Sequence, residues 1–62
     1  MNYAAAAAAL RDMMLAEKQS QALYFRQQAH LCRCELEYDL AAAYEQDYAE
    51  AIAEIAALKD QQ

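Results

Sequence analysis

The chain has 62 residues, 60% of them hydrophobic, and a formal net charge of −5 at pH 7. It has no glycine or proline, 17 alanines, and Ile52 and Ile55 as its only β-branched residues. This composition favours helices and excludes a β-sheet. A chain this short has room for one domain with a thin core. We therefore expect an all-α protein with a single helical domain, residues 1–62, that gains buried surface by association.

Charge is divided unevenly along the chain. Residues 1–33 carry a net charge of +2, from four Arg or Lys and two Asp or Glu, whereas residues 34–62 carry −7, from one Lys and eight acids. Binding to nucleic acids or to anionic membranes needs clustered positive charge, so this charge distribution disfavours both. The apolar run at residues 4–10 is too short to cross a bilayer and has no preceding basic segment of a secretory signal. We expect a cytoplasmic protein that binds neither nucleic acid nor membranes directly.

The first predicted helix is short and covers about residues 2–17, with Asn2 as its N-terminal cap. A polar run, residues 17–21, then interrupts the apolar spacing. Ser20 within this run is a residue type that caps a following helix. The sequence therefore predicts a turn at about residues 18–20 and a long second helix over about residues 21–59, which together form a helical hairpin.

Apolar residues recur at alternating steps of three and four over residues 31–55, with Glu45 as the one polar exception. The eight positions are Leu31, Cys34, Tyr38, Ala41, Glu45, Tyr48, Ile52 and Ile55. Continued backwards, the same register passes through Tyr3, Ala6, Leu10, Met13, Glu17, Ser20, Tyr24 and Gln27. This spacing marks a seam that one helix buries against another. We expect Glu45 to face Arg11 or Lys18 of the folded-back helix, or to mark the edge of the seam.

A second apolar stripe lies on the side away from this seam. Its members are Leu15, Ala22, Phe25, Ala29, Cys32, Leu36, Leu40 and Ala43. A helix that is apolar on two faces needs cover on both, so we expect two hairpins to pair into a dimeric four-helix bundle. The alternative is one unbroken coiled-coil helix.

His30, Cys32 and Cys34 are the residues that suggest a metal site. Cys32 and Cys34 point about 200° apart on a helix and cannot hold one ion together. His30 and Cys34 are one turn apart, and two such pairs across a two-fold axis would supply four ligands suited to zinc. A cysteine in a helix seam more commonly packs as a small hydrophobic residue. We therefore expect no cofactor and no metal, and keep a dimeric zinc site at His30 and Cys34 as an alternative.

No catalytic pattern is present in the sequence. It has no glycine-rich phosphate loop, and its single histidine has no nearby Ser or Asp that would suggest a catalytic triad. We expect a non-enzymatic protein without a small-molecule substrate. Its predicted function is protein–protein interaction, as an adaptor, chaperone-like subunit or inhibitor that binds itself as a homodimer or binds another protein. The predicted contact residues are Phe25, Cys32, Leu36, Leu40, Tyr44 and Tyr48.

The acidic C-terminal half supports an alternative function. Asp47, Glu50 and Glu54 are predicted to form an exposed acidic surface along one side of the second helix. Such a strip could occupy the basic groove of a nucleic-acid-binding partner and inhibit it.

Overall fold

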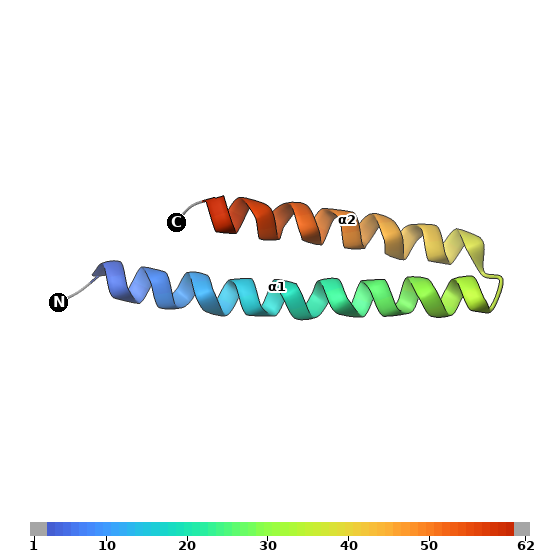
Figure 1. The fold of residues 1–62 in the computed structure, drawn as a ribbon, viewed down its shortest axis with the longest axis horizontal. Helices are drawn as coiled ribbons and strands as arrows, with labels where there is room; N and C mark the ends of the chain where they lie inside the picture. Colours follow the sequence, from blue (N-terminus) through green and yellow to red (C-terminus); the bar gives the residue numbers. More distant parts are fainter. Residues whose placement is uncertain (1–2, 61–62) are drawn as a thin grey trace.

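The computed structural model describes residues 3–60, which form an antiparallel hairpin of two helices (Figure 1). Helix α1 spans Tyr3–Cys34 and helix α2 spans Tyr38–Asp60. Within residues 3–60 there is no β-strand. The predicted all-α class and the helical hairpin are confirmed, whereas the predicted cap at Asn2 lies outside the described residues.

The predicted turn at residues 18–20 is wrong, because α1 continues unbroken through them. The first helix is also the longer one, with 32 residues against 23 in α2. Glu, Lys and Gln lose little on entering a helix, so the polar run at residues 17–21 does not end it. The one-helix alternative is wrong as well, since the chain reverses at residues 35–37.

The observed turn is built around Leu36, whose φ of 64° lies in the left-handed region. The Leu36 N–H donates to the Arg33 carbonyl at 3.2 Å, and the Glu37 N–H donates to the Cys32 carbonyl at 2.8 Å. These two bonds around a left-handed residue define a Schellman motif. Glycine usually occupies the left-handed position, and a leucine there costs about 1–2 kcal/mol. The turn therefore has none of the residue types that mark a turn in a sequence.

Charged residues on both sides of the turn complement the two helix dipoles. Arg33 lies in the last turn of α1, and Asp39 lies in the first turn of α2. A cation near a helix C-terminus and an anion near a helix N-terminus are each stabilising. This pair is the sequence signal for the turn, and sequence reasoning missed it.

The two helices pack through one strictly spaced stripe on each. On α1 the inner stripe consists of Ala8, Arg11, Leu15, Lys18, Ala22, Phe25, Ala29 and Cys32, and each of these residues is buried or half-buried. On α2 the facing residues are Ala41, Tyr44, Tyr48, Ala51, Ile55 and Leu58, which are also buried or half-buried. Steps of three and four throughout give the packing of an antiparallel coiled coil.

The core between the helices is thin. Six residues are buried among those described: Ala22, Ala29, Cys32, Ala41, Ala51 and Ile55. The hairpin measures 54 × 15 × 10 Å and has a radius of gyration of 15.1 Å, whereas a compact chain of this length would have about 11 Å. Much of each helix therefore remains in contact with solvent.

Candidate functional site

The side of α1 that faces away from α2 repeats the spacing of the inner stripe. This outer stripe consists of Tyr3, Ala6, Leu10, Met13, Glu17, Ser20, Tyr24, Gln27, Leu31 and Cys34, and all ten residues are exposed. From Leu10 on, each member lies two residues after a member of the inner stripe, which is about 200° around the helix. The two stripes therefore lie on opposite sides of α1.

Large apolar side chains are concentrated on the outer stripe. Tyr3 is 74% exposed, Met13 69%, Leu10 58% and Leu31 51%. Tyr24 is also half exposed, and its ring contacts Tyr44 of α2 edge to face, with the ring centroids 6.4 Å apart. Exposed large apolar side chains gathered on one face are a mark of an interaction site.

In the structure, the stripe of α1 that faces α2 is not the one that the sequence predicted. The register through Tyr3, Leu10 and Leu31 was expected to face the other helix, but the stripe with Ala22, Phe25, Ala29 and Cys32 lies there instead. On α2 the expected register is half right: Ala41, Tyr48 and Ile55 face α1, whereas Tyr38, Glu45 and Ile52 are exposed. The large residues of α2 need small residues opposite them, and only the inner stripe offers alanines along its length.

The six predicted contact residues do not form one surface. Cys32 is buried within the hairpin, and Phe25, Tyr44 and Tyr48 are half-buried between the helices. Leu36 and Leu40 are exposed, in the turn and in the first turn of α2. Partner binding by Leu36 and Leu40 stays a prediction.

Two side chains of the hairpin interior have shifted pKa values. Burial, together with the nearby carboxylates of Glu37 and Glu35, raises the pKa of the Cys32 thiol. The Tyr24 side chain and desolvation raise the pKa of Tyr44. Both shifts favour the neutral forms; the main cause is burial for the pKa of Cys32 and the neighbouring Tyr24 for the pKa of Tyr44.

The predicted acidic residues do lie together. Asp47, Glu50 and Glu54 line a shallow groove of about 150 Å³ on one side of the hairpin. The Lys18 ammonium contacts Glu54 Oε2 at 2.5 Å, so part of this negative charge is neutralised within the chain.

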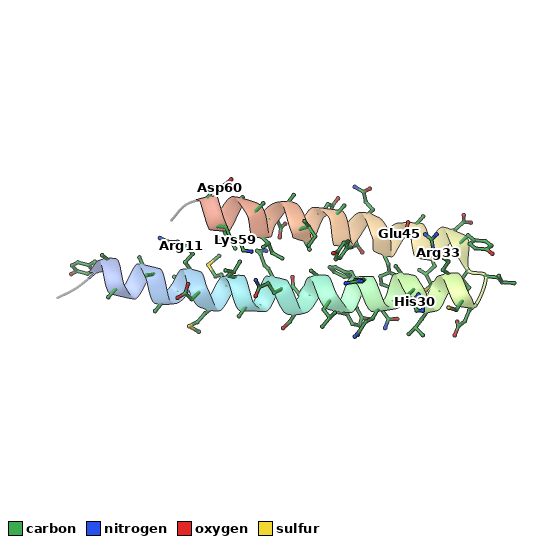
Figure 2. The ribbon with its side chains drawn as sticks, viewed as in Figure 1. Arg11, His30, Arg33, Glu45, Lys59 and Asp60 are labelled. Carbon is green, nitrogen blue, oxygen red and sulfur yellow. The ribbon has the colours of Figure 1, made fainter. Side chains whose placement is uncertain are left out.

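The other side of the hairpin is lined by basic, uncharged polar and apolar residues, with Glu45 as an acidic member. Arg26 borders three adjoining shallow grooves there, which also involve His30, Arg33 and Lys59. Arg33 forms an ion pair with Glu45 near the turn (Figure 2). The expected pairing of Glu45 with Arg11 or Lys18 is wrong, because the chain reverses at residues 35–37 and places Glu45 beside the end of α1.

His30 and Cys34 come together as the helical spacing predicts. The Cys34 Sγ lies 3.6 Å from His30 Nε2, and both side chains are exposed. Within residues 3–60 no three His, Cys, Asp or Glu side chains gather in a group that could hold a metal ion. One chain therefore offers two ligands at this position, and a tetrahedral zinc site needs further ones.

Comparisons with known proteins give no family for this fold and surface. No family model matches the chain, and no curated protein or solved structure is significantly similar to it. Neither helix, over residues 3–60, has an apolar stretch long enough to cross a membrane.

Proposed function

We propose that the chain is a non-enzymatic helical interaction module that docks another helix on the outer stripe of α1 and assembles with itself into a four-helix dimer. The observation that carries this proposal is the exposure of all ten outer-stripe residues. Such spacing is typical of helices that pair, and among the ten residues of the outer stripe the hairpin engages Tyr24, whose ring contacts Tyr44 of α2.

The exposed area supports association. The hairpin exposes 4785 Å², whereas a compact protein of 7.0 kDa would expose about 4,000 Å². The difference, about 800 Å², equals the area that each partner of a standard interface buries. One docked helix on α1 would therefore bring the chain to ordinary compactness.

The outer stripe holds the residue types that stabilise interfaces most. Tyrosine buries a large area with few rotatable bonds, and Tyr3 and Tyr24 both belong to the stripe. Leu10, Met13 and Leu31 add flexible apolar side chains, and Glu17 is the one formally charged member. We expect most of the binding free energy to come from these five apolar residues.

Sedimentation velocity over a wide concentration range tests this proposal. We expect the wild-type chain to reach about twice the mass of 7.0 kDa and to dissociate on dilution. The double variant Leu10→Ser/Leu31→Ser should remain a folded monomer over the same range, because it removes two apolar anchors. The control Ile52→Ser, at an exposed residue of α2 outside the outer stripe, should still form the dimer.

A wild-type chain that stays monomeric at every concentration would contradict self-association. A double variant that dimerises as well as the wild type would show that another surface makes the contact.

The segregation of charge favours a second candidate function, inhibition of a basic partner by the acidic surface. Asp47, Glu50 and Glu54 line one side of the hairpin, and Arg26, Arg33 and Lys59 line the other. Fluorescence anisotropy with a labelled arginine-rich peptide tests this candidate. Changing the three acids to lysine should abolish binding, whereas Asp60→Lys, farther along α2, should reduce it only slightly. Equal binding by both variants would remove the candidate.

A further inference from the structure

We infer that the helix docked on the outer stripe is α1 of a second copy, running antiparallel about a two-fold axis that crosses α1 between Lys18 and Gln19. This inference rests on the proposed self-association and adds the orientation and the register of the pair. It follows from the order of residues along the stripe and from the position of Glu17.

The outer stripe has two apolar blocks separated by a polar centre. The N-terminal block runs from Tyr3 to Met13, and the C-terminal block runs from Tyr24 to Cys34 with Gln27 as its polar member. Between them lie Glu17 and Ser20. Antiparallel pairing about the centre of α1 places each block against the other block of the second copy, and the polar centres against each other. Five layers result, each occurring twice: Tyr3 with Cys34, Ala6 with Leu31, Leu10 with Gln27, Met13 with Tyr24, and Glu17 with Ser20.

Side-chain sizes agree with this register. Leu31 meets Ala6, and Tyr3 meets Cys34, so a large residue faces a small one in both outer layers. Alternation of large and small residues lets facing helices interdigitate. A shift by one heptad in the direction that pairs Leu10 with Ser20 and Met13 with Glu17 would set both of these apolar residues against polar ones. The proposed register has one such layer, Leu10 with Gln27.

Glu17 disfavours the parallel arrangement. Parallel pairing in register would place the two Glu17 carboxylates in one layer, where like charges repel. Antiparallel pairing sets each Glu17 opposite Ser20, whose hydroxyl can donate a hydrogen bond to the carboxylate. The two Glu17 residues then lie in neighbouring layers, about 4.5 Å apart along the helix axis. Antiparallel helix dipoles also attract, whereas parallel ones repel.

The unequal helix lengths add surface to this interface. The N-terminal turns of α1 extend past the end of α2 (Figure 1), and Tyr3, the first residue of α1, is 74% exposed. In the antiparallel pair the C-terminal block of the second copy runs along this extension. The full length of α1, about 48 Å for 32 residues, then takes part in the interface.

The arrangement has a consequence for the His30–Cys34 pair. Antiparallel pairing places the two pairs near opposite ends of the interface, with the two Cys34 residues about 45 Å apart. Parallel pairing would bring them together as a possible four-ligand zinc site. The orientation of the dimer therefore decides whether that site can form.

Crosslinking with a short bismaleimide reagent tests the orientation. In a Cys32→Ala background, Tyr3→Cys gives a chain whose two thiols lie at opposite ends of α1, too far apart to be joined within one helix. We expect efficient crosslinks between residue 3 of one copy and residue 34 of the other, identified by mass spectrometry after proteolysis. The matched control, Cys32→Ala alone, should give almost no crosslinked dimer.

Each other result overturns the inference in a recognisable way. If Cys32→Ala alone crosslinks efficiently through Cys34, the helices are parallel, and the proposed self-association stands while the antiparallel register is wrong. If sedimentation shows a dimer but residue 3 does not link to residue 34, the register is wrong. If sedimentation shows only monomers, both the inference and the proposed self-association are wrong.

Discussion

The inner and outer faces of α1 have the same spacing of residues but different side chains and different neighbours. On the inner face Ala22, Ala29 and Cys32 are buried against α2, whereas on the outer face Leu10 and Leu31 are more than half exposed. Small residues let the second helix of the same chain approach closely, and large ones remain outside it. In this molecule, the face richer in large apolar residues is therefore the one that α2 leaves exposed.

Removing a large side chain from the interior should have the largest effect on stability. Ile55 is 8% exposed and packs with Ala22 and Ala51. The variant Ile55→Ala should therefore lower the free energy of unfolding by about 2 kcal/mol. This loss is near the lower end for such changes because the core is thin. The control Ile52→Ala removes the same atoms from a residue that is 43% exposed and should cost less than about 1 kcal/mol. Urea unfolding followed by circular dichroism measures both. Equal losses would mean that these positions do not differ in burial.

The turn between the two helices can be stabilised. Leu36→Gly removes the cost of a left-handed leucine but adds chain entropy to the unfolded state, so we expect a gain of about 0.5–1 kcal/mol in stability. Leu40→Gly, at an exposed leucine inside α2, should lose about 1 kcal/mol. Thermal unfolding of both variants gives the comparison. A loss of stability in Leu36→Gly would contradict the left-handed turn.

The ion pair between Lys18 of the inner stripe and Glu54 should contribute less. Both side chains keep contact with solvent, 29% and 56% exposed, so Glu54→Gln should cost about 0.2–1 kcal/mol at low salt and almost nothing at high salt. Glu50→Gln, which leaves the Lys18 contact in place, serves as the control. An equal and salt-independent change in the two variants would show that the ion pair adds nothing.

A small pH effect should distinguish Tyr44 from the exposed tyrosines. The pKa of Tyr44 is raised above its ordinary value of 10.0, mainly by the Tyr24 side chain. The unfolded chain therefore loses this proton at a lower pH than the folded chain does. The free energy of unfolding that this proton contributes is present below pH 10 and should fall as pH rises through the folded-state pKa. Tyr44→Phe should weaken this fall, whereas Tyr38→Phe, at a residue that is 60% exposed, should leave it unchanged. Unfolding free energies measured between pH 8 and 11 would show no difference between these variants if the pKa of Tyr44 were ordinary.

The sequence predicted the helical class and the hairpin because both follow from composition and spacing. The absence of glycine and proline left helix as the one regular structure, and the steps of three and four predicted paired helices. His30 and Cys34 were placed correctly on one face because their separation of one turn fixes that relation in any helix.

The position of the turn could not be read from turn-forming residues. Leu36 adopts a conformation that favours glycine, and the chain has no glycine to mark it. Because the turn was predicted at the wrong place, the predicted partner of Glu45 was also wrong. Both stripes of α1 were found in the sequence. The hydrophobicity of their residues does not determine which stripe packs against α2. The small side chains of Ala22 and Ala29, opposite the tyrosines of α2, are the feature that indicates the inner stripe.

The two cysteines provide the most direct test of the two-faced helix, because Cys32 lies on the inner stripe and Cys34 on the outer one. Alkylation by iodoacetamide can be followed at each thiol separately, since trypsin cleaves after Arg33 and puts them in different peptides. We expect Cys34 to react much faster than Cys32 in dilute protein, and a higher protein concentration to slow Cys34 while Cys32 stays slow. Equal rates for the two thiols, or a Cys34 rate that does not depend on concentration, would contradict the account.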